Sequence, residues 1–248
     1  MSHRQQSGAD LSADQRPEPA TPSSRIEGEK RRRTTLLRRK LAVGIAPAIA
    51  LLMLPTVAAA DHIYDGIIPT ATYGPACING TVTDSPVCRT DNASVYWYAD
   101  SNDYAALEQN DKDALSGMLS AQYQPTDLTV THESNPVFSG SGETDIIYQE
   151  ETDGLTGLYG ITWCDDAVNG ELYTCDQTYI RIVTPDGYRV EGGSVACHET
   201  GHAVGLVHGT EAYPVLDPGD DRLGCMENAE EFPPNLGNNS AHLINGVY

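Results

Sequence analysis

The sequence predicts an α/β (α+β) fold with a mixed, mostly parallel, twisted β-sheet. Three observations lead to this prediction. Runs of β-branched and aromatic residues recur along the chain, a long amphipathic run separates the first of them from the others, and a histidine-bearing helical run follows the last. The last two strand-like runs flank a turn-rich stretch, as in a hairpin, which predicts an antiparallel strand at one sheet edge.

The elements are expected in a fixed order. The stretch ASVYWYA (93–99) favours a strand, and Leu107, Leu115 and Leu119 recur near helical spacing within a long helix, 104–123. Further strands are expected at 127–133, 145–151, 158–164 and 178–184. A helix over about 193–202, a short helix at 240–246 and a small irregular C-terminal part rich in Pro and Gly complete the chain.

The N-terminal region is typical of an export signal. Residues 1–60 combine a long basic stretch, an apolar run over 41–60 and small residues before a cleavage point after Ala60. The alternative is a signal anchor, because twenty apolar residues can span a bilayer. The prediction is therefore a signal peptide (1–60), a disulfide-stapled N-terminal segment (61–91) and a folded domain (92–248), secreted or, in the alternative, anchored by 41–60.

Charge divides the chain at the same place. Residues 1–60 hold ten Lys/Arg and five Asp/Glu, whereas residues 61–248 hold five and thirty, a net charge of −25. Such an acidic protein repels nucleic acids and anionic membranes, so neither is expected as a partner after signal cleavage.

Six cysteines, all after the predicted signal, indicate an oxidising compartment. Six allow fifteen pairings, and free or metal-bound cysteines are the alternative. Spacing favours Cys77–Cys88 and Cys164–Cys175 as small loops, which leaves Cys197–Cys225.

The run ACHETGHAVGLVHG (196–209) carries the candidate chemistry. On a helix, His198 and His202 lie one turn apart on one face, where both can bind one zinc ion, with Glu199 beside them as general base. A straight helix would carry His208 about 15 Å from His198, too far for a shared ion. Gly205 can reverse the chain because glycine adopts a left-handed conformation without a Cβ clash.

The eleven-residue pattern 198–208 resembles the extended signature of the metzincin zinc endopeptidases, and the chain is closest to their secreted bacterial members. The family also has a methionine turn, for which Met226 stands eighteen residues after His208. Gly209 leaves the subfamily open. The resemblance spans about 90–248. It implies that the domain 92–248 is a metzincin-like catalytic domain in which Met226 forms a floor beneath the metal.

The resemblance implies a secreted, monomeric endopeptidase that acts on protein or peptide substrates, with one catalytic zinc ion bound by the three histidines and Glu199 as general base. It further implies a substrate strand running antiparallel to the strand near 158–163, and a pocket wall formed by the segment from Met226 to about residue 237. Calcium is a second candidate ion at the acidic turns 100–103 and 217–221, where solvated turns are the alternative. Two other functions remain open: an inactive secreted zinc-binding module and a membrane-tethered interaction domain.

Overall fold

The computed structural model describes residues 64–82, 86–151, 155, 157–182, 192–228 and 233–248. The predicted signal peptide lies outside these residues, and the end of the predicted strand 178–184 does as well. All described residues belong to one compact unit.

The predicted sheet class is confirmed. The strands are β1 (Arg89–Thr90), β2 (Ser94–Ala99), β3 (Thr129–His132), β4 (Ile146–Glu150), β5 (Gly160–Ala167) and β6 (Thr174–Ile182). They follow the order β1-β6-β4-β2-β3, and β5 pairs with β6. Every pairing is parallel except β5 with β6, which is antiparallel as the hairpin pattern predicted. The sequence did not predict β1, because two residues are too few to show a period of two.

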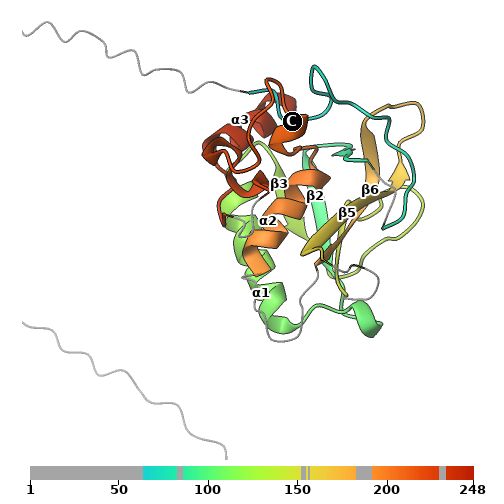
Figure 1. Ribbon diagram of the computed structural model, residues 1–248. Coiled ribbons are helices and arrows are strands. Elements are labelled where there is room, and N and C mark those ends of the chain that lie inside the picture. Colours follow the sequence, from blue (N-terminus) through green and yellow to red (C-terminus); the bar gives the residue numbers. More distant parts are fainter. Residues whose placement is uncertain (1–63, 83–85, 152–154, 156, 183–191, 229–232) are drawn as a thin grey trace, which may run out of the picture. The chain divides into compact units, whose positions relative to one another are not determined.

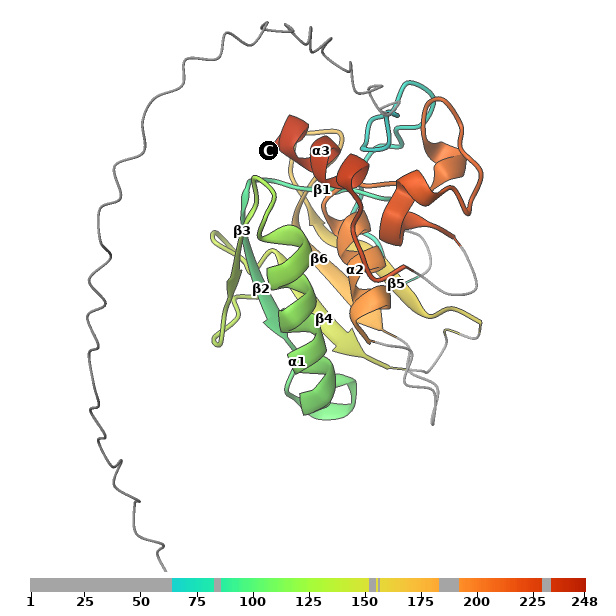
Figure 2. The same cartoon turned by 90° about the vertical axis from the view of Figure 1, so that its left-hand side faces the viewer.

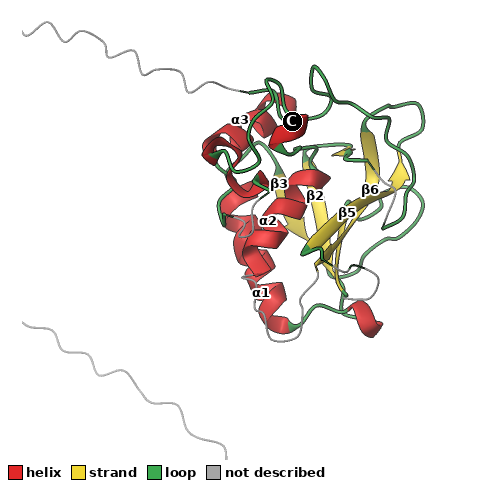
Figure 3. Ribbon diagram, viewed as in Figure 1, coloured by secondary structure: helices red, strands yellow, loops and turns green. Residues whose placement is uncertain are grey.

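Two of the three α-helices in the described ranges cover one face of the sheet, as Figures 1 and 2 show. The helices are α1 (Gln109–Met118), α2 (Gly192–Ala203) and α3 (Asn238–Val247). Val95, Trp97 and Ala99 alternate along β2 and join the core beneath the helices, whereas Tyr96 between them is 45% exposed. This alternation is the period of two of a strand, and near the end of β2 the opposite face is covered too, because Tyr98 is buried with its ring edge-on to Phe138. Figure 3 shows the short helical turns and loops that surround α3 in the C-terminal part.

The predicted helix 104–123 begins too early, whereas its end at Tyr123 is confirmed, because a π-helical turn continues α1 to that residue. Asp103–Ala105 form a 3-10 turn, α1 begins only at Gln109, and Leu119–Tyr123 form a π turn. Leu107 is buried outside any helix, where its N–H bonds the carbonyl of Asp100. Leu107 therefore matched the helical spacing because it is buried, although it lies outside the helix. The π turn ends at Tyr123, whose hydroxyl donates a hydrogen bond to α2.

The helix α2 is buried along almost its whole length, from Ser194 to Ala203. Most of its residues are small, so neighbouring elements approach its backbone on several sides. Two fully buried tyrosines contact it: Tyr123 Oη donates to the Cys197 carbonyl at 2.6 Å, and Tyr148 Oη lies 2.8 Å from Thr200 Oγ1. A helix fixed in this way is a rigid support for the side chains that it carries.

The described part of residues 61–91 packs against the same helix end. β1 joins the sheet, and isolated bridges link Ile67 to Leu206 and Arg89 to Val204. The three predicted disulfides, Cys77–Cys88, Cys164–Cys175 and Cys197–Cys225, are all present.

Candidate metal centre

The chain reverses direction directly after α2. Gly205 has φ +93°, its N–H bonds the His202 carbonyl at 3.0 Å, and the Leu206 N–H bonds the Gly201 carbonyl at 2.8 Å. This pair of bonds is the Schellman motif, which ends a helix at a left-handed glycine. A Cβ at Gly205 would also collide with the side chain of Arg89 and approach Ile68 Cγ1 within 3.3 Å. Both the conformation and the crowding therefore require glycine at this position.

The turn brings three imidazoles together. The Nε2 atom of His198 lies 3.1 Å from that of His202 and 3.0 Å from that of His208, and the remaining pair is 3.2 Å apart. Ligands about 2.0–2.1 Å from one tetrahedral zinc ion lie about 3.3 Å apart. The nitrogen triangle therefore fits one metal ion of zinc size, and the three histidines form a group able to hold a metal.

The outer ring nitrogens determine the tautomers of the two helical ligands. His198 Nδ1 lies 2.7 Å from the Cys225 carbonyl, and His202 Nδ1 lies 2.9 Å from the Leu206 carbonyl. A carbonyl only accepts, so each Nδ1 carries the proton and each Nε2 presents its lone pair to the centre of the triangle.

The third ligand has a different partner. Glu211 Oε2 accepts the His208 N–H at 3.2 Å and lies 3.7 Å from His208 Nδ1. Both side chains are 28% exposed, whereas His198 and His202 are buried. A carboxylate behind a metal-ligating imidazole raises the basicity of the ring.

Electrostatics keep the ligands neutral. Burial and the charge of His208 lower the pKa of His198 to about 4, and burial lowers the pKa of His202 well below its usual range. Burial lowers the pKa of His208 as well, while Glu211 raises it. Neutral imidazole is the form that binds a metal.

Glu199 is held from the edge strand β5 and not from its own helix. Thr162 Oγ1 lies 2.7 Å from Glu199 Oε2 and 3.0 Å from the Glu199 carbonyl oxygen. A Cβ at Gly160 would lie 2.6 Å from Glu199 Cγ, so the glycine leaves the space that this side chain occupies. Burial raises the pKa of Glu199 to about 7, against the lowering effect of the Thr162 hydrogen bond. A carboxyl group with this pKa can take up and release a proton near neutral pH.

Met226 and the neighbouring disulfide support the helix from behind. Met226 is fully buried, and its sulfur packs directly against Gly201, which lies between His198 and His202 in the chain. The Cys197–Cys225 disulfide joins α2 to the same turn, and the Cys225 carbonyl is the one that orients His198.

The acidic turns that the sequence suggested for calcium have protein partners. Asp100 accepts hydrogen bonds from Asn102 and Gln149, and Asp220 pairs with Arg222 at 2.6 Å. The acidic side chains that converge in the described structure are Glu143, Asp166 and Asp176.

Sequence reasoning missed the supports of the site, namely Gly160, Thr162, Glu211 and two main-chain carbonyls. Only Glu211 had a local signal, three residues after His208. Thr162 is 37 residues from Glu199, and nothing in a strand pattern identifies which helical residue it will face.

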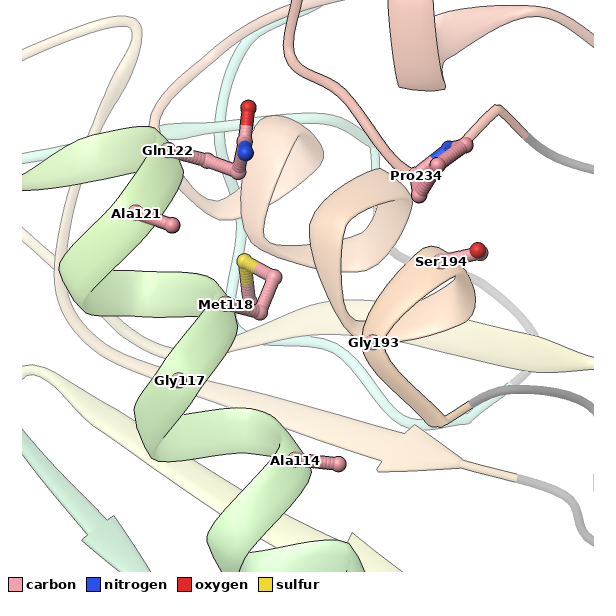
Figure 4. A pocket seen from close by; sticks show the side chains of 8 residues that line it. All are labelled: Ala114, Gly117, Met118, Ala121, Gln122, Gly193, Ser194 and Pro234. Atoms are coloured by element: carbon pink, nitrogen blue, oxygen red, sulfur yellow. The ribbon is translucent and has the colours of Figure 1, made fainter.

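A separate groove lies between α1 and the first turn of α2, with a volume of about 280 Å³ (Figure 4). Met118, Gln122, Ser194 and Pro234 are among its lining residues, and the metal ligands are not. It therefore lies apart from the histidine centre.

Neither a scan against protein-family models nor a search of curated proteins finds a match for this chain. Within the described ranges, no helix is long and apolar enough to cross a bilayer.

Proposed function

We propose that this protein is a secreted zinc-dependent endopeptidase. The observation that carries the proposal is a triangle of three neutral imidazole nitrogens on the same helix end as a buried carboxyl group with a pKa of about 7. Imidazole donors suit zinc, and three protein ligands leave a fourth position for water or substrate, as catalytic zinc sites require.

The catalytic roles follow from the contacts. Bound zinc would supply a Lewis acid that lowers the pKa of water to about 7 and polarises the peptide carbonyl. Glu199 takes a proton from the attacking water and delivers it to the leaving amine. Thr162 holds the carboxyl group in place during this transfer, and the hydrogen bonds to the Cys225 and Leu206 carbonyls keep His198 and His202 correctly oriented.

The edge strand supports peptide binding. Among the described strands β5 pairs only with β6, and it lies beside α2 (Figure 1). Thr162 of β5 contacts Glu199 there. A substrate that adds to this edge as an antiparallel strand would place a main-chain carbonyl near the histidines. The segment from Met226 to about residue 237 would form the pocket wall, although residues 229–232 lie outside the described part.

Secretion is part of the same proposal. Three disulfides fit an oxidising compartment. Residues 1–60 would serve as the export signal, or residues 41–60 as an anchor, and N-terminal sequencing of the exported protein decides between them. The expected partners are protein or peptide substrates and not nucleic acid. The enzyme is expected to act as a monomer.

The test compares the purified chain with Glu199→Ala. We expect one tightly bound zinc in both by elemental analysis, with casein and peptide hydrolysis in the parent only. Hydrolysis that is equal in the variant would refute the mechanism, and inactivity of both zinc-loaded proteins would favour the inactive zinc-binding module. Purified protein without zinc would favour the interaction domain.

A further inference from the structure

The outer edge of β5 is not uniform along its length. Near its C-terminal end the edge is already occupied: the Gly80 N–H donates to the Cys164 carbonyl at 2.9 Å, and Asn79 Oδ1 accepts the Ala167 N–H at 2.8 Å. Asn79 and Gly80 therefore cover this end of the strand as a short added strand would. We refer to these two residues as the edge cap.

The other half of the edge is open. In an antiparallel pair, successive residues direct their N–H and C=O groups alternately toward and away from the partner strand. The Cys164 carbonyl points away from β6. The N–H and C=O groups of Thr162 and Gly160, two and four residues earlier, therefore also point away from β6. The register agrees, because Thr178, opposite Cys164, donates its N–H to Asp145 on the β4 side. Over the ranges that the structure describes, no main-chain partner bonds Gly160 or Thr162 on this side.

The edge cap is held firmly in place. The Cys77 N–H bonds the Leu172 carbonyl at 2.6 Å, and the Cys77–Cys88 disulfide ties the cap to β1, which pairs with β6. The Cys164–Cys175 disulfide packs against Cys77–Cys88 in one buried cluster. Figure 1 shows this N-terminal segment in teal beside the yellow hairpin of β5 and β6.

We propose that the edge cap ends the substrate-binding edge at Cys164 and thereby determines how many residues of a peptide the enzyme engages. This inference rests on the proposed peptidase function. Glu199 contacts Gly160 and Thr162, so the scissile bond lies beside the open half. For a substrate antiparallel to β5, the residues N-terminal to that bond run toward Cys164.

The open stretch has a definite length. From Gly160 to Cys164 a strand advances four residues, or roughly 13 Å, which accommodates about four substrate residues opposite Gly160–Trp163. Because the scissile bond lies within this span, at most about three residues can precede it. The preferred substrates are thus peptides with a short ordered segment before the cleaved bond, and longer N-terminal extensions gain nothing.

The first test uses the parent enzyme with fluorogenic peptides whose N-terminal side grows one residue at a time. We expect kcat/KM to rise by roughly three- to tenfold per useful residue and then to stay level beyond about three, because each strand hydrogen bond contributes modestly. A steady rise through five or six residues would overturn the inference. Absence of hydrolysis with every peptide would instead refute the proposed function.

The second test removes the edge cap. Asn79→Ala with Gly80→Pro deletes both hydrogen bonds to β5, because proline has no N–H. We expect hydrolysis of the shortest good peptide to remain within about twofold, and peptides with five residues before the bond to improve by roughly threefold or more.

A matched control exists at the opposite sheet edge. Gln124 Oε1 accepts the Val130 N–H of β3 in the way that Asn79 Oδ1 accepts that of Ala167, and both side chains are exposed. Gln124→Ala should leave the length profile of the parent unchanged. A folded double variant that keeps the parent profile, or a Gln124→Ala protein that loses it, would contradict the role of the edge cap.

Discussion

The metal centre combines two regions of different construction. His198 and His202 are buried on a rigid helix, and their outer nitrogens bond main-chain carbonyls that no substitution removes. His208 follows a turn, is partly exposed, and has the Glu211 side chain behind it. The helical pair is therefore part of the folded core, whereas the third ligand can be tuned by side-chain chemistry.

Removing one ligand from each region gives the largest effect. His198→Ala and His208→Ala should each weaken zinc binding by roughly a hundred- to a thousandfold, about one ligand's share of the binding free energy. Only His198→Ala should also destabilise the zinc-free protein, because it empties a buried position and leaves the Cys225 carbonyl unpaired. Chelator competition and unfolding in excess EDTA measure the two quantities. Equal loss of apo stability in both variants would remove the distinction between the two regions.

The turn that joins the regions is tested by Gly205→Ala, with Gly170→Ala as its control. Both glycines have φ near +90°, but a Cβ at Gly170 would meet nothing within 4 Å. We expect about 1–2 kcal/mol of destabilisation from backbone strain at Gly170. At Gly205 we expect about 3 kcal/mol, because crowding against Arg89 adds to the strain. Urea unfolding of the apo proteins measures the two losses of stability. A similar loss at both sites would show that crowding at Gly205 is unimportant.

The buried pair should also make the zinc-free protein sensitive to acid. Unfolded histidine takes up a proton near pH 6.5, whereas folded His198 stays neutral down to about pH 4. The unfolded state therefore binds more protons over this range, and the free energy of unfolding falls as the pH drops, by up to about 3 kcal/mol for His198.

Glu199 acts in the opposite direction, because its pKa is raised to about 7 and its stabilising effect is lost as the pH rises through that value. The measurement is therefore made in a Glu199→Gln background, with and without His198→Asn, by urea unfolding at pH 7, 5.5 and 4. If the dependence of the unfolding free energy on pH did not change when His198 is replaced, His198 would not be the cause of the acid sensitivity.

The sequence predicted the two regions unequally well. Helical spacing alone places His198 and His202 on one face, and the left-handed glycine explains how His208 returns. Their supports depend on tertiary structure: Thr162 and the Cys225 carbonyl come from distant segments. The failed prediction of helix over 104–108 has a similar cause, because Leu107 is buried by packing and not by helical periodicity.

Glu199 lies on the same rigid helix as the two helical ligands, but its carboxyl group is hydrogen-bonded by Thr162 of β5. Replacing Thr162 tests whether this hydrogen bond positions Glu199. Thr162→Val removes the hydroxyl at nearly constant shape and should lower kcat by about tenfold, with KM and zinc content little changed, because a misplaced base transfers protons less efficiently. Thr162→Ser should restore most of the activity. Thr131→Val, on exposed β3, serves as the control. An equal loss in the serine and valine variants would show that the hydroxyl is not what positions Glu199.

The smallest effect is expected at Glu211, where the comparison of the two regions is tested most directly. Glu211→Gln keeps an oxygen that can accept the His208 N–H but removes the charge behind the ring. We expect zinc affinity to fall by about tenfold or less. The carboxylate is 3.7 Å from His208 Nδ1 and partly exposed, so its electrostatic effect on the ring is weak. Apo stability should change little. Chelator competition at low and high salt provides the measurement, and the difference between parent and variant should shrink as salt screens the charge. Unchanged zinc affinity at low salt would mean that the charge of Glu211 does not tune the third ligand, which would remove this difference between the two regions.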